Sequence, residues 1–192
     1  MRGLFLFDLD GTLYEGEAPF RYFTQTIARG MDEPNKSRCL DPCAAYFAAN
    51  SREIVATWDA VIAMTDPFVE DPKTCPQAYW DTCDYMLDDA CSLVVNPALR
   101  QFLHEAHGHA TLVLATNSPP EAALPLLRRL QLLDAFDHIH TEVGKPEGLV
   151  PLGSRLAPDL PSYHIVSIGD SYPNDMVPAW QAGWQTAHIS PK

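Results

Sequence analysis

Positively charged residues are scarce in this chain. Its 192 residues include 13 Lys and Arg against 25 Asp and Glu, which gives a formal net charge of −12. A protein that binds the nucleic-acid backbone needs clustered Lys and Arg, and so does a helix that lies on an anionic membrane. The composition therefore argues against nucleic acid and membrane as partners. An acidic protein that handles phosphate groups must supply positive charge locally, through a few placed lysines or a metal ion.

Long apolar runs and paired cysteines are also lacking. No segment approaches the roughly twenty apolar residues that span a bilayer. The run that follows the N-terminal Arg2 ends at Asp8, too soon for the apolar part of a secretory signal. The five cysteines form no CxxC pair, and an odd number does not suggest a disulfide framework. These absences predict reduced thiols and a cytoplasmic protein.

The stretch Leu4–Leu13, LFLFDLDGTL, carries the strongest local signal. Its four consecutive apolar residues are typical of a short strand that is buried on both faces. Asp8 and Asp10 follow at i and i+2, so their side chains point the same way if the strand persists. Neighbouring acids resist joint ionisation, which favours a site for a cation or a reaction. The decapeptide by itself is equally compatible with a solvated turn.

The rest of the chain predicts an α/β fold with an insertion. Beyond residue 96, strand-like runs alternate with helical segments, which predicts a Rossmann-like, doubly wound parallel sheet. These runs are Thr111–Ala115, Asp137–Thr141, His164–Ile168 and Gln185–Ile189. Residues 15–95 show no clear strand, and the helices predicted there are Phe20–Met31, Pro42–Asn50, Arg52–Met64 and Pro76–Ala90. We expect a core of residues 1–14 and 96–192, and a mainly helical cap domain of residues 15–95.

Polar residues follow the predicted strands at their carboxyl ends, where open parallel sheets bind ligands. Asp8 and Asp10 follow the first strand, and Lys145 lies in a later turn. The other polar residues at this edge are Thr116, Asn117, Ser118, Asp170, Ser171, Asn174 and Asp175. Several carboxylates, a lysine and a hydroxyl at one edge of a sheet indicate a catalytic or metal site rather than chance polar loops.

Four segments in this order resemble the motifs of the haloacid dehalogenase superfamily, whose members transfer phosphoryl groups through an aspartate nucleophile. They are DLDGT at Asp8–Thr12, LATNS at Leu114–Ser118, GKP at Gly144–Pro146 and GDSYPND at Gly169–Asp175. An insertion between the first and second motifs is similar to the branch of the family that has a small helical cap.

The resemblance implies a role for each catalytic residue. Asp8 would attack phosphorus and form an aspartyl-phosphate. Asp10 would protonate the departing alcohol and later deprotonate the water that hydrolyses the intermediate. Thr116, together with the backbone N–H of Asn117, would hold the phosphoryl oxygens. Lys145 would neutralise the phosphate and the Asp8 carboxylate.

The resemblance also implies a Mg²⁺ cofactor. The ion would bind Asp8, the carbonyl oxygen of Asp10, and Asp170, which are the hard oxygen ligands that it prefers. Asp175 would support the site, either through a water at the metal or by orienting Lys145.

The expected function is hydrolysis of a small phosphomonoester such as a nucleotide, phosphoglycolate or a sugar phosphate. Dehalogenases of the family lack an acid at the position of Asp10, so its presence favours phosphate esters. A sugar-phosphate mutase remains open, as does a non-catalytic phosphate-binding or regulatory module. The aromatic residues of 15–95 are more simply the core of a helical bundle than a ligand site, although Phe20–Phe23 lie nearest to Asp10 in sequence and are candidates for substrate contact. The oligomeric state is not predicted.

Overall fold

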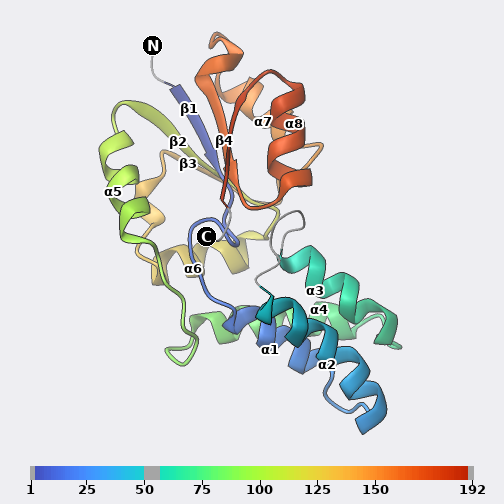
Figure 1. The fold of residues 1–192 in the computed structure, drawn as a ribbon. Coiled ribbons are helices and arrows are strands. Elements are labelled where there is room, and N and C mark those ends of the chain that lie inside the picture. The colour runs from blue at the N-terminus through green and yellow to red at the C-terminus, as the bar shows by residue number, and fades with distance from the viewer. Residues whose placement is uncertain (1–2, 50–56, 190–192) are drawn as a thin grey trace. The chain divides into compact units, whose positions relative to one another are not determined.

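A computed structural model describes residues 3–49 and 57–189 of the chain (Figure 1). These residues divide into two compact units. One contains residues 3–15 and 94–189, and the other contains residues 16–93. Within the described part, no helix combines the length and the apolar character that crossing a bilayer requires.

The first unit is built on a five-stranded sheet in which all neighbouring strands are parallel. The strands are β1 (Gly3–Phe7), β2 (Ala110–Ala115), β3 (His138–His140), β4 (Ile165–Gly169) and β5 (Gln185–His188). Their order is β3-β2-β1-β4-β5, so the chain builds outward from β1 on one side and then on the other. The switch point lies between β1 and β4, and such a point is where doubly wound sheets bind their ligands.

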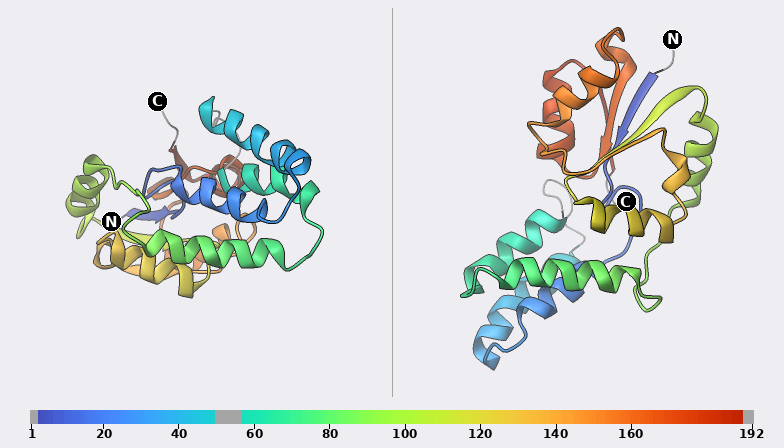
Figure 2. Two further views of the ribbon diagram at one scale, coloured as in Figure 1. Left: turned by 90° about the horizontal axis from the view of Figure 1, so that it is seen from below. Right: turned by 180° about the vertical axis from the view of Figure 1, so that it is seen from behind.

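Helices cover both faces of this sheet. Successive side chains of β1 point to opposite faces, and apolar side chains on each face pack against helices. The helices are α5 (Pro97–Ala106), α6 (Pro120–Arg129), α7 (Leu149–Leu156) and the short α8 (Val177–Gln181). On one face Phe5 stacks on Phe102 of α5, with ring centroids 6.0 Å apart. On the other face Leu4 and Leu6 belong to a core cluster with residues of α7 and α8. Figures 1 and 2 show α5 and the α7–α8 pair on opposite sides of the strands. The predicted Rossmann-like core is confirmed.

The described residues of the second unit, 16–49 and 57–93, form a bundle of four α-helices. These are α1 (Ala18–Ile27), α2 (Glu33–Ala48), α3 (Thr57–Thr65) and α4 (Thr74–Leu87). Its core consists of Phe20, Phe23, Ile27, Cys39, Cys43, Phe47, Val61 and Ala78. The indole of Trp58 packs edge-on against Phe20 and Phe23, at 5.0 and 5.4 Å between ring centroids. None of the five cysteines, all of which the structure describes, forms a disulfide, and three of them are buried. Aromatic packing therefore supplies much of this small core.

The predicted start of α2 at Pro42 is wrong. The helix begins at Glu33, because the Asp32 carboxylate accepts a hydrogen bond from the Asn35 N–H and caps it, while Pro34 lies in the first turn. Pro42 is inside the helix, where it cannot donate a backbone hydrogen bond one turn back. Its neighbours Cys39 and Cys43 are buried in the bundle core, so tertiary packing outweighs the helix-breaking tendency of proline. The predicted helix at Arg52–Met64 lies partly outside the described residues.

Candidate active site

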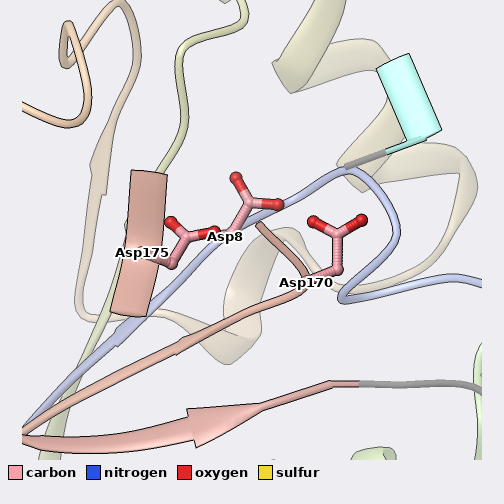
Figure 3. A group of neighbouring side chains, drawn as sticks. All are labelled: Asp8, Asp170 and Asp175. Atoms are coloured by element: carbon pink, nitrogen blue, oxygen red, sulfur yellow. The ribbon is translucent and has the colours of Figure 1, made fainter. Parts of the chain in front are cut away.

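Three carboxylates gather at the carboxyl edge of the sheet. Asp8 follows β1 directly, and its N–H donates to the Ile168 carbonyl of β4, at 2.8 Å. Asp170 follows β4, and Asp175 lies in the π-helical turn η4 (Tyr172–Met176). One oxygen from each carboxylate lies within 4.8 Å of the others. Figure 3 shows the three side chains rising from neighbouring segments on the same side of the sheet. Residues that are 167 positions apart in sequence, Asp8 and Asp175, thus share one site.

Lys145 connects two of these carboxylates. Its Nζ lies 2.6 Å from Asp8 Oδ1 and 2.7 Å from Asp175 Oδ1, and its side chain is 3% exposed. Burial by itself lowers the pKa of this ammonium group, but the charges of Asp8 and Asp175 outweigh burial and raise the pKa of Lys145 above its ordinary value. The lysine is therefore a fixed positive charge. Of the two placements predicted for Asp175, the structure contains the direct contact with Lys145.

The site carries more negative charge than Lys145 balances. Burial, followed by the charge of Asp8, raises the pKa of the Asp170 carboxyl above its ordinary value. Two glycines allow the acids to come this close. A Cβ at Gly11, whose φ is 78°, would overlap the Asp170 carboxylate, and a Cβ at Gly169 would overlap the Asp175 carboxylate. Closely spaced hard oxygen donors with excess negative charge fit a divalent cation such as Mg²⁺.

The side chain of Asn117 holds the loop that carries Lys145. Its Oδ1 accepts from the Lys145 N–H at 2.7 Å, and its Nδ2 donates to the Lys145 carbonyl at 3.0 Å. The same loop is attached to the end of β2 by the Val143 N–H, which donates to the Thr116 carbonyl at 3.0 Å. The sequence indicated only a backbone role for Asn117. Its side chain anchors the main chain from which Lys145 extends.

We expect Asn117→Ala to weaken catalysis by displacing Lys145. Loss of both hydrogen bonds lowers the free energy of unfolding by about 1–3 kcal/mol. Even a small displacement of a charged group reduces kcat, here by about tenfold or more. Urea unfolding and steady-state kinetics measure the two effects. Asn35→Ala, at an exposed asparagine of α2, is the matched control, and an Asn117→Ala enzyme with unchanged kcat would contradict this role.

Thr116 is buried at the end of β2, with 1% of its surface exposed. Its Oγ1 accepts from the Ser118 N–H at 3.0 Å. A hydroxyl group both donates and accepts, so this contact leaves the hydroxyl proton of Thr116 for an acceptor such as a phosphoryl oxygen.

The carboxylate of Asp10 is held by two hydroxyl groups. Its Oδ1 accepts from the Tyr14 hydroxyl at 2.6 Å, and its Oδ2 accepts from the Ser118 hydroxyl at 2.9 Å. Burial, followed by the charge of Asp10, raises the pKa of Tyr14 well above its ordinary value, so this phenol stays protonated and donates. Strand β1 ends at Phe7, so the turn, not strand alternation, sets the direction of Asp10. Sequence reasoning misses Tyr14, because an aromatic position next to a turn gives no sign of a polar contact.

Two other sequence-based candidates have different outcomes. The sequence indicates Ser118 as a polar residue at the sheet edge without a role, and the structure gives it the contact with Asp10. The second candidate is the stretch Phe20–Phe23, predicted to contact the substrate, and the structure favours a role in packing for two of its residues, Phe20 and Phe23. Each is 2% exposed and packed in the core of the helical bundle, because their spacing along α1 places both on its apolar face.

The chain thus carries an acidic site with a buried lysine at the carboxyl edge of a doubly wound sheet. A family model of haloacid dehalogenase-like hydrolases matches residues 3–183. The chain therefore belongs to this family of enzymes. A search of curated proteins finds no match to this sequence.

Solved structures share the fold along nearly the whole chain. A candidate hydrolase of this family, YfnB from Bacillus subtilis, solved bound to magnesium, has a TM-score of 0.65 and 18% identity, covering 100% of this chain and 93% of its own. A predicted phosphoglycolate phosphatase from Haemophilus somnus has a TM-score of 0.65 and 18% identity, covering 97% and 84%. A candidate β-phosphoglucomutase from Thermotoga maritima has a TM-score of 0.58 and 22% identity, covering 98% and 85%. At these identities, the similarity shows a shared fold and nothing about activity.

Proposed function

We propose that this hydrolase is a Mg²⁺-dependent phosphatase that cleaves a small phosphomonoester through an aspartyl-phosphate on Asp8. The observation that carries the proposal is the position of the Asp8 carboxylate, which lies at the end of β1, in contact with Lys145 and within 4.8 Å of acidic oxygens of Asp170 and Asp175. A carboxylate held beside a fixed cation can approach an anionic phosphate, because the cation offsets the repulsion between the two.

The chain's own residues account for both half-reactions. Asp8 forms a bond to phosphorus as the bond from phosphorus to the alcohol oxygen breaks, and Asp10 gives its proton to that oxygen. Asp10 then takes a proton from a water that attacks phosphorus and releases Asp8. Lys145 balances the charge on the transferred group, and the Thr116 hydroxyl with the Asn117 backbone N–H binds its oxygens. Asp175 holds Lys145 in place through their 2.7 Å contact.

Magnesium fits the acidic cluster, and we propose that Asp8, the carbonyl oxygen of Asp10, and Asp170 hold it. When bound, the ion would supply positive charge that stabilises the transferring phosphoryl group and its attacking and leaving oxygens. We further propose that residues 15–95 serve as a cap domain that limits access of water to the site.

The primary test is release of inorganic phosphate from p-nitrophenyl phosphate. We expect turnover with Mg²⁺ and loss of turnover in EDTA that is reversed by excess Mg²⁺. A panel of nucleotides, phosphoglycolate and sugar phosphates, ranked by kcat/KM, then identifies the substrate class. Binding of Mg²⁺ and phosphate without hydrolysis of any ester would favour the non-catalytic alternative.

The alternative is a mutase of the same superfamily, which would also use Asp8 and Asp10. The fold shared with the candidate β-phosphoglucomutase is compatible with this alternative. The two activities differ in the acceptor of the phosphoryl group. Phosphorus NMR of the products separates them, since a phosphatase yields inorganic phosphate and a mutase yields an isomeric sugar phosphate.

We also expect Mg²⁺ to stabilise the folded protein, because it binds the native cluster and not the unfolded chain. Saturation at about 100 times the dissociation constant adds roughly 2.7 kcal/mol, which thermal unfolding detects as a rise in Tm. Asp170→Asn removes a ligand and a like charge, so this variant unfolds at a higher temperature than the wild type in EDTA and responds less to Mg²⁺. An equal Mg²⁺ response in both proteins would place the ion elsewhere.

A further inference from the structure

The two hydroxyl contacts of Asp10 come from separate segments of the chain. Tyr14 follows the turn after β1 and is 2% exposed, whereas Ser118 follows β2. Each hydroxyl binds a different oxygen, at 2.6 Å for Tyr14 and 2.9 Å for Ser118. A contact on a single oxygen constrains the direction of a carboxylate less than contacts on both oxygens. Two contacts on different oxygens are satisfied together in one orientation.

We propose that Tyr14 and Ser118 are positioning residues that orient the Asp10 carboxyl group toward the oxygen of the leaving group. This inference rests on the proposed function, in which Asp10 transfers protons. The two residues touch neither phosphorus nor the leaving group in this scheme, and they act through Asp10.

The proton balance explains why hydroxyl groups suit this task. In the first half-reaction the proton of the Asp10 carboxyl group moves to the alcohol oxygen as its bond to phosphorus breaks, and Asp10 becomes a carboxylate. Both hydroxyls then donate to that carboxylate, as in the structure. In the second half-reaction Asp10 regains a proton from the attacking water. A protonated carboxyl group keeps acceptor capacity beside its single O–H. Both hydroxyls can therefore go on donating to Asp10 while its proton faces the leaving group, and the orientation is the same in both charge states.

Two esters with different leaving groups differ in how much their cleavage depends on the proton of Asp10. A phenyl ester has a poor leaving group that needs the proton from Asp10, whereas the 2,4-dinitrophenolate ion leaves without one. Loss of orientation at Asp10 therefore slows cleavage of the first ester far more than cleavage of the second. A general loss of folding or of phosphate binding would slow both equally.

The experiment compares kcat/KM for phenyl phosphate and 2,4-dinitrophenyl phosphate, with saturating Mg²⁺. Tyr14→Phe removes one oxygen atom and keeps the ring, and Ser118→Ala removes the second donor. We expect either change to lower kcat/KM for the phenyl ester by about 10–100-fold, as for a lost hydrogen bond to a charged group. The expected fall for the dinitrophenyl ester is below about threefold, a difference of less than 1 kcal/mol.

Two control variants separate positioning from folding. Ser118→Thr retains a hydroxyl group and should keep most of the activity toward phenyl phosphate. Tyr163→Phe changes a tyrosine that is 61% exposed and should leave kcat/KM unchanged for both esters. If Tyr14→Phe does not fold, Ser118→Ala and Ser118→Thr still decide the question.

The outcomes distinguish this inference from the proposed function. A wild-type enzyme that releases no phosphate from either ester would overturn both. An active wild type, with variants that lose activity equally on the two esters or lose none, would overturn the positioning role alone.

Discussion

Asp8→Asn should abolish phosphate release in a protein that still folds. The substitution keeps the shape of the side chain but replaces a nucleophilic carboxylate by an amide, so we expect kcat to fall by at least about 10⁴-fold, as when other covalent nucleophiles are removed. It also removes the negative charge that Asp8 presents to Lys145, which remains paired with Asp175 at 2.7 Å. Phosphate release during steady-state turnover measures the activity, and circular dichroism verifies the fold.

The matched control is Asp159→Asn, at an exposed acid of the same unit, which should retain full activity. Purified Asp8→Asn protein must be checked by mass spectrometry for deamidation, because conversion of a few molecules to aspartate would restore a trace of turnover. Turnover at the wild-type rate by an Asp8→Asn protein whose amide is verified as intact would contradict the nucleophilic role.

Lys145→Met should reduce both stability and activity, because it leaves buried carboxylates without their cation. Lys145 contacts Asp8 and Asp175 with 3% of its side chain exposed. Breaking a buried charge pair by removing one partner costs about 3–5 kcal/mol of unfolding free energy. We expect kcat to fall by about 10³-fold, since a fixed cation no longer balances the transferred phosphoryl group. Urea unfolding in EDTA and assays with Mg²⁺ measure the two quantities.

A second substitution separates these effects. Lys145→Met combined with Asp175→Asn removes one of the two carboxylate charges that the loss of Lys145 leaves unpaired, so stability should recover in part while kcat stays low. Lys36→Met is the control for loss of a lysine, because Lys36 lies at the surface with Glu33 at 3.8 Å, a pair worth at most about 1 kcal/mol. Full activity of a folded Lys145→Met enzyme would show that charge balance at this position is dispensable.

The core of the fold was predictable because its pattern is local and periodic. The apolar pattern predicts buried strands at Leu4–Phe7 and Thr111–Ala115. The structure contains β1 at Gly3–Phe7 and β2 at Ala110–Ala115. Acids and a lysine that follow such strands meet at one edge, because the strands are parallel and the order switches at β1. The proximity of Asp8, Asp170 and Asp175 follows from this geometry.

Other features depend on contacts that no local pattern specifies. The start of α2 depends on capping by Asp32 and on burial of the face around Pro42, and a proline in sequence is more simply interpreted as a helix start. The side chain of Asn117 binds the Lys145 main chain 28 positions away. The Tyr14 contact with Asp10 needs the turn at Gly11. Each becomes visible only once the chain is folded around the site.

The most direct test of the central claim is to trap the phosphorylated enzyme during turnover. Wild-type protein mixed with Mg²⁺ and p-nitrophenyl phosphate is quenched in acid, digested and measured by mass spectrometry. The account predicts a phosphoryl group on the peptide that contains Asp8, labile to hydroxylamine as an acyl phosphate is, and its absence in Asp8→Asn. A phosphoryl group attached to another residue, or rapid turnover with Asp8 never modified, would contradict the account.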